Sequence, residues 1–148
     1  MNQSIFKAYD IRGRYPEEIN EEAVAEIAGA LAGYFSKVRD SRSSNTIVVG
    51  HDARLSSPAL LEAVLDGLKI PALKGDARQG RQDSKLKILN VGMITTPMLY
   101  FLVNHFKAVG GIMVTASHNP KEFNGLKVVG EKAAPMSGLE IKKLVIGR

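Results

Sequence analysis

The sequence contains neither cysteine nor tryptophan. Without cysteine, the chain cannot form disulfides, bind zinc through thiolates or use a thiol as a catalytic nucleophile. No stretch approaches the run of about 18 apolar residues that a membrane-spanning helix needs. The first ten residues are polar and mixed, and they lack the apolar core of a signal peptide. We therefore expect a cytoplasmic protein with no membrane partner.

The composition is otherwise that of an ordinary globular domain with a positive net charge. Its 148 residues are 45% hydrophobic and 24% charged, and the formal net charge is +5, which favours anionic partners. Part of the positive charge lies between Lys69 and Lys87, a polar stretch that also contains Pro71, Gly75 and Gly80. No aromatic residue is interleaved there for stacking on bases. A solvated loop is therefore favoured, and we expect no nucleic-acid partner.

Alternating apolar patterns predict an α/β fold. Asn20 is a suitable N-cap for a helix over 20–38, whose buried stripe would be Val24, Ile27, Ala28, Leu31 and Phe35. Further strands are expected at 46–50, 86–92, 112–114 and 126–129, with helices from a Ser57 cap, from a Thr96 cap, and over 137–146. This order favours a three-layer sandwich around a mixed, mostly parallel sheet.

Small and polar residues follow the central predicted strand abruptly, in the order Thr115-Ala116-Ser117-His118-Asn119-Pro120. Asn119-Pro120 is a turn signal, so we expect Ser117 in the first turn beyond the carboxyl end of a strand. Open α/β sheets bind ligands at that edge. By composition alone, a loop serine that satisfies local backbone groups is the simpler interpretation.

Lys127 follows the serine by ten residues. Strand residues alternate between faces, so if Leu126 and Val128 face the core, Lys127 looks toward a cleft. Asn124-Gly125 is expected to make a tight return that brings Lys127 near Ser117. The alternative is an exposed strand lysine.

Two earlier segments carry arginines that could meet an anion. Phe6 to Gly13 reads as a short strand and turn with Arg12, whose planar guanidinium can pair two phosphate oxygens. His51-Asp52-Ala53-Arg54 follows a predicted strand. Asp52 and Arg54 could be functional, or they could form an internal ion pair that organises the turn.

Three of these segments together resemble the α-D-phosphohexomutases, in particular the phosphomannomutase/phosphoglucomutase group. The matching segments are Lys7 to Gly13, the Gly50-His51-Asp52-Ala53-Arg54 turn and the Thr115 to Pro120 loop. The resemblance covers nearly the whole chain but only the amino-terminal domain of the family. It implies the fold of that domain over residues 1–148, with the later domains absent.

The resemblance also implies a role for each site residue. Ser117 would carry a phosphoryl group and contact Mg²⁺ through that phosphate. The catalytic residues would be Ser117, Lys127, His118 and Arg12, and the substrate-binding residues Tyr9, Arg12, Asn119 and Lys127. Lys127 would be the general acid/base. A nearby phosphate dianion favours protonated lysine, so His118 is the alternative proton carrier because imidazole titrates near neutrality.

The implied reaction interconverts hexose 1-phosphate and 6-phosphate through a phosphoserine and a bisphosphate, with Mg²⁺ as cofactor and hexose 1,6-bisphosphate as activator. The expected partners are hexose phosphates and the carboxyl-terminal domains of the same enzyme. The six aspartates are scattered and suggest no clustered Mg²⁺ cage, so we expect the domain to be inactive alone. The alternative function is a non-enzymatic phosphate-binding or serine-phosphorylated module.

Overall fold

The computed structural model describes residues 1–37, 44–69 and 86–147. Six strands form one sheet: β1 (Ile11–Arg14), β2 (Ser44–His51), β3 (Lys87–Met93), β4 (Ala108–Val114), β5 (Phe123–Gly130) and β6 (Pro135–Met136). The helices are α1 (Glu21–Lys37), α2 (Ser57–Lys69), α3 (Thr96–His105) and α4 (Gly138–Ile146), with short 3-10 turns η1 (Gln3–Ile5) and η2 (Glu131–Ala133). None of the helices in these ranges combines the length and apolar character needed to cross a bilayer.

The sheet is mixed, and its strand order is β1-β5-β4-β2-β3, with β6 added beside β5. Parallel pairing is confined to β2 with its neighbours β3 and β4. β5 runs antiparallel to β4, to β1 and to β6. The predicted α/β class and the mixed sheet are confirmed, but the sheet is not mostly parallel, because two of its described strand pairs are parallel and three are antiparallel. The antiparallel part of the sheet carries Arg12 and Lys127.

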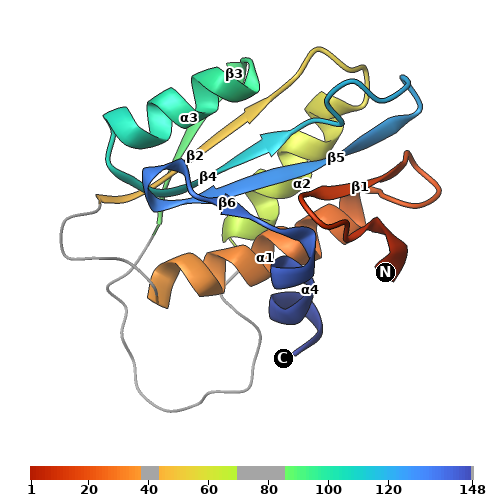
Figure 1. Cartoon of the computed structure of the whole chain (residues 1–148), viewed down its shortest axis with the longest axis horizontal. Helices are drawn as coiled ribbons and strands as arrows, with labels where there is room; N and C mark the ends of the chain where they lie inside the picture. The colour runs from red at the N-terminus through yellow and green to blue at the C-terminus, as the bar shows by residue number, and fades with distance from the viewer. Residues whose placement is uncertain (38–43, 70–85, 148) are drawn as a thin grey trace.

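Helices cover both faces of the sheet, which gives three layers (Figure 1). α1, α2 and α4 pack on one face over the larger apolar core, which includes Leu31, Ile112 and Leu126. α3 covers the other face, where Leu99 and Val103 pack against Met113. β4 lies between the two cores and is buried along its whole length.

The predicted starts of α1 and α4 are confirmed. The Asn20 side chain accepts a hydrogen bond from the amide of Ala23 at 3.0 Å, and the predicted stripe of α1 is buried. Ser137 caps α4 in a reciprocal pair with Glu140. Each such cap contributes about 1 kcal/mol to the stability of its helix.

Three local predictions are wrong. The N-cap of α3 is Thr95, whose hydroxyl accepts from the amide of Met98, so Thr96 is the first helical residue. Ser57 lies inside α2, and its hydroxyl donates to Asp52 instead of capping the helix. Asn124-Gly125 makes no turn, because both residues lie within β5 and pair with β1. Most of the predicted basic loop, residues 70–85, lies outside the described residues.

Candidate active site

Ser117 lies just beyond the carboxyl end of β4, as predicted. Thr115 and Ala116 are still buried, whereas Ser117 is exposed. Its φ of 54° is in the left-handed region, which a residue with a Cβ rarely adopts. The Ser117 Oγ is 3.3 Å from Nδ1 of the exposed His118, so the structure brings these two predicted residues into contact.

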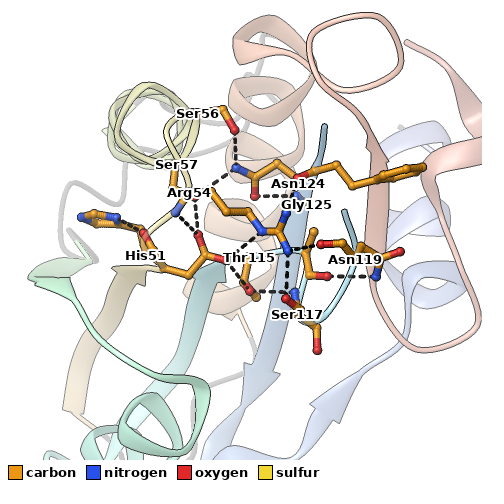
Figure 2. Close-up of polar contacts among 12 residues, drawn as sticks. His51, Arg54, Ser56, Ser57, Thr115, Ser117, Asn119, Asn124 and Gly125 are labelled. Atoms are coloured by element: carbon orange, nitrogen blue, oxygen red, sulfur yellow. Dashed lines mark hydrogen bonds and ion pairs between the residues drawn. The ribbon is translucent and has the colours of Figure 1, made fainter. Parts of the chain in front are cut away.

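Arg54 holds the loop that carries Ser117 (Figure 2). Its Nη2 donates to the carbonyl oxygens of Ser117 and Asn119, at 2.8 and 2.7 Å. Its Nη1 donates to those of Pro120 and Phe123, at 2.7 and 3.0 Å. Nε donates to Asp52 at 3.1 Å. A guanidinium has five N–H donors, and all five are therefore used within the protein.

Asp52 connects Arg54 to the serine loop. Its Oδ1 accepts from the Ser57 hydroxyl and the Arg54 amide, and its Oδ2 accepts from Arg54 Nε and the Thr115 hydroxyl at 2.8 Å. Burial alone would raise the pKa of Asp52. The hydrogen bonds from Ser57, Arg54 and Thr115, together with the charge of Arg54, outweigh burial and lower the pKa below its ordinary value.

Two residues that the sequence interpretation did not select complete this network. The Thr115 hydroxyl accepts a hydrogen bond from the amide of Ser117 at 2.9 Å. The buried Asn124 donates to the hydroxyls of Ser56 and Ser57, at 2.8 and 3.0 Å, and so ties β5 to α2. The sequence left two interpretations of Asp52 and Arg54 open, and the structure shows the internal ion pair. This pair organises the serine loop as well as its own turn.

Asn119 also lies within the loop. Its side-chain amide and its backbone amide both donate to the carbonyl of Ala116, at 2.9 and 3.0 Å. Its own carbonyl accepts from Arg54. These contacts hold the turn that follows Ser117.

Strand register puts Arg12, Lys127 and Thr115 on one face of the sheet. Lys127 is paired with Met113, and Arg12 with Gly125, whose carbonyl accepts from the Thr115 amide. Ile11, Val114 and Leu126 are buried on the opposite face, under α1 and α2, and side chains alternate along each strand. The face predicted for Lys127 is therefore observed, although the predicted turn before it is not.

Arg12 and Lys127 differ from Arg54 in having donors to spare. Arg12 pairs with Asp10 through Nη2, and its Nε is buried without a hydrogen-bond partner. Lys127 is half-buried and makes no hydrogen bond or ion pair with another described residue. Tyr9, in the turn before β1, is 83% exposed and makes no hydrogen bond with another described residue.

A cavity of about 460 Å³ lies away from Ser117, between α1, α4 and the sheet. A second one, of about 430 Å³, is directly beside the serine. It lies between the loop after β2, the start of α3 and the end of β4. Its lining residues are Asp52, Ala53, Met93, Ile94, Thr95, Thr96, Met98, Met113, Thr115 and Ser117. The exposed serine thus stands at the rim of open space on the α3 face.

Residues 3–145 match the family described as "Phosphoglucomutase/phosphomannomutase, alpha/beta/alpha domain I". The chain belongs to this family. It is 43% identical over 137 residues to a protein of Xanthomonas campestris pv. campestris strain B100 named "Phosphohexose mutases". It is 42% identical over 137 residues to a phosphomannomutase of Salmonella montevideo. Both matches cover 93% of this chain and 26% of the relative, so the chain spans about a quarter of their length.

Solved structures from the family have the same fold. A phosphoglucomutase/phosphomannomutase family protein from Burkholderia thailandensis matches with a TM-score of 0.75 and 30% identity, over 97% of this chain and 29% of its own. A putative phosphomannomutase from Thermus thermophilus matches with a TM-score of 0.72 and 29% identity, over 95% and 28%. The fold expected from the resemblance is therefore confirmed.

The described residues do not by themselves suit a magnesium ion. No group of three or more histidine, cysteine, aspartate or glutamate side chains within the described ranges could hold a metal. Asp52 is the acidic residue that lines the cavity beside Ser117, but both of its oxygens already accept two hydrogen bonds each. Oxygen ligands for Mg²⁺ would have to come from elsewhere.

Proposed function

We propose that this chain is the phosphoserine-bearing domain of a phosphohexomutase, which interconverts hexose 1-phosphates and hexose 6-phosphates together with the further domains that its longer relatives possess. The observation that carries the proposal is the exposed Ser117 at the end of β4, with Arg12 and Lys127 on the same face of the sheet. Membership of the family supports it.

In the proposed reaction, Ser117 begins as the phosphoserine. A hydroxyl oxygen of the hexose monophosphate attacks the phosphorus while the bond between phosphorus and the Ser117 Oγ breaks. Lys127 accepts the proton of the attacking hydroxyl, and the serine oxygen takes up a proton as it leaves. The product is a hexose bisphosphate. The reverse sequence at the other phosphate then returns a phosphoryl group to Ser117, so phosphate is conserved over the cycle.

Charge is the main obstacle to this reaction, since a phosphoserine dianion faces an anionic substrate. Phosphoryl transfer depends mostly on positioning and on neutralising that charge. Arg12 is suited to the task because it retains unpaired N–H donors, and a guanidinium binds phosphate oxygens in a planar, paired geometry. His118, whose Nδ1 is 3.3 Å from the serine oxygen, is proposed to give a proton to that oxygen as it leaves and to take the proton back in the reverse step.

Tyr9 and Asn119 are proposed to contact the sugar or its phosphate from the two ends of this face, Tyr9 from the turn before β1. Hexose 1,6-bisphosphate is proposed as the activator that first phosphorylates Ser117. Mg²⁺ is proposed to contact the phosphate on Ser117, with its protein ligands supplied by other domains, because the described residues of this chain form no cage for it.

The proposal is tested with a chimera in which this chain replaces the matching 137 residues of the Xanthomonas relative. The purified chimera is incubated with glucose 1,6-bisphosphate and Mg²⁺, and phosphorylation is located by intact mass and peptide mapping. We expect one phosphoryl group, confined to Ser117, and turnover of glucose 1-phosphate or mannose 1-phosphate. The Ser117→Ala chimera should show neither.

A chimera that folds and binds sugar phosphate yet carries no phosphate on Ser117 would contradict the proposal. The same holds if Ser117→Ala turns over substrate as fast as the unmodified chimera. The unmodified Xanthomonas protein serves as the positive control for the assay.

A further inference from the structure

We propose that Asp52, Arg54 and Thr115 form a clamp that positions Ser117, with Arg54 acting on the loop and not on the substrate. This inference rests on the proposed function of Ser117. It assigns to these three residues the task of presenting the serine oxygen at one fixed point, so that the phosphoryl group is transferred in line.

Arg54 and Arg12 differ in how many of their N–H groups already have hydrogen-bond acceptors. Every N–H of the Arg54 guanidinium already has an acceptor, four of them backbone carbonyls of the loop from Ser117 to Phe123. A phosphate could recruit Arg54 only by breaking one of these bonds. The Arg54 side chain is also largely buried, with 13% of it exposed. Its bonds to the carbonyls of Asn119 and Phe123 are partly buried, so breaking one of those leaves a partly desolvated carbonyl without a donor.

The clamp makes hydrogen bonds to both peptide groups that flank Ser117. On the amino side, the Ser117 amide donates to the Thr115 hydroxyl, which itself donates to Asp52. On the carboxyl side, the Ser117 carbonyl accepts from Arg54. Because Arg54 is also hydrogen-bonded to Asp52, the contacts on the two sides of Ser117 belong to one network. With both polar backbone groups directed into the network, the side chain of Ser117 points away from it (Figure 2).

The strained backbone of Ser117 explains why this residue has to be held in place. A non-glycine residue in the left-handed region costs on the order of 1–3 kcal/mol and persists only where its surroundings hold it. Ser117 has φ 54° and cannot be glycine, since the reaction needs its hydroxyl. The hydrogen bond that Arg54 donates to the Ser117 carbonyl and the one that the Thr115 hydroxyl accepts from the Ser117 amide offset that cost. A loop without them would relax toward negative φ and move the oxygen.

The first test uses the 148-residue chain and needs no activity. Amide hydrogen exchange is measured by NMR in wild type, Arg54→Lys, Thr115→Val and Thr115→Ser. We expect the Ser117 amide to exchange roughly tenfold faster in Arg54→Lys and Thr115→Val, the effect of losing about one hydrogen bond. Thr115→Ser, which keeps the hydroxyl, should stay near wild type. Amides of β4 should not change, which separates a local effect from global destabilisation.

The second test measures steady-state kinetics in the chimera. Arg54→Lys keeps the positive charge but cannot reach five acceptors, so kcat should fall by roughly a hundredfold, as expected for a misplaced reacting group. KM for the sugar phosphate should stay within the error of wild type, because Arg54 contacts no substrate. Arg14→Lys is the matched control, since the Arg14 guanidinium contacts the ring of Phe123 and makes no hydrogen bond to the carbonyl groups that Arg54 holds.

Several results would overturn the clamp. One is an unchanged Ser117 exchange rate in both Arg54→Lys and Thr115→Val. Another is a rise in KM at unchanged kcat for Arg54→Lys, which would make Arg54 a substrate-binding residue. Failure of the proposed function has a different signature, namely an unmodified chimera that never phosphorylates Ser117. The exchange measurement decides on the clamp even then.

Discussion

At the residue scale, the carboxylate of Asp52 is the main hydrogen-bond acceptor of the site. Four hydrogen bonds reach it from three residues, Arg54, Ser57 and Thr115. Together the four bonds favour the ionised form, because a protonated carboxyl carries an O–H on one oxygen and can accept fewer hydrogen bonds. The position of the serine loop is therefore linked to the protonation of Asp52.

The lowered pKa of Asp52 predicts a specific loss of stability in acid. The folded state holds this carboxyl ionised below its ordinary pKa of 3.8, whereas the unfolded chain takes up the proton at that value. Its contribution to stability is thus complete above about pH 5 and is lost as the pH falls through the folded-state pKa. Urea unfolding between about pH 3 and 6, roughly the span of this titration, should show a weaker acid dependence in Asp52→Asn than in wild type.

The control for this measurement is Asp66→Asn. Asp66 is exposed and pairs with Lys69 at the surface of α2, where an ion pair contributes little. Its removal should leave the acid dependence close to that of wild type. Equal slopes for wild type and Asp52→Asn would show that the Asp52 network does not favour the ionised carboxyl.

At the scale of elements, the packing of α3 on β4 depends on a strand glycine. A Cβ placed on Gly111 would lie 2.7 Å from Cγ2 of Val103 and 3.3 Å from Cγ of Leu99. Gly111→Ala should therefore lower the free energy of unfolding by about 1–3 kcal/mol, the usual cost of overpacking a core. Equilibrium urea denaturation followed by circular dichroism measures this difference.

Gly130 supplies the matched control, since it lies at the end of the neighbouring strand β5. Its nearest atom to an added Cβ is the carbonyl oxygen of Ala134 at 3.9 Å, an ordinary contact. Gly130→Ala should be neutral or slightly stabilising, because alanine restricts the unfolded chain. If both variants lose the same free energy, the close approach of α3 to β4 is not the cause.

The sequence predicted the elements whose local pattern has a single solution. The α1 stripe, the Asn20 cap, the start of the last helix near Ser137 and the buried strand before Ser117 follow from spacing and residue type alone. Thr95 and Thr96 are both competent caps, so pattern could not separate them. Asn124-Gly125 has the composition of a turn, but pairing with β1 on one side keeps it extended, and on the other side the Thr115 amide donates to the Gly125 carbonyl.

The clamp was out of reach of sequence reasoning for a different reason. Arg54 donates to carbonyl groups that lie 63 to 69 residues further along the chain. Every residue type has a backbone carbonyl, so the residue types at these positions do not indicate that their carbonyls accept hydrogen bonds from Arg54. The aspartate and arginine of the β2 turn could be noticed, but their distant partners appear only once β2 and β4 lie side by side.

At the scale of the whole molecule, one face of the sheet near Ser117 is left for something else to complete. Arg12 and Lys127 keep unused donors there, and the described residues offer no metal cage. The chain spans about a quarter of the length of its Xanthomonas and Salmonella relatives. Under the proposed function, the nucleophile and its clamp lie within this domain, whereas charge neutralisation of the two phosphates needs groups from the other domains.

This division predicts that the 148-residue chain folds alone but does not turn over substrate. We expect one cooperative unfolding transition, as for most single domains of this size. With glucose 1-phosphate, glucose 1,6-bisphosphate and Mg²⁺, no steady-state mutase activity should appear at enzyme concentrations where the Xanthomonas protein is readily measured. Positioning by the missing contacts could account for about 7–11 kcal/mol of the barrier. Turnover by the isolated chain, lost in Ser117→Ala, would mean that this domain alone neutralises both phosphates.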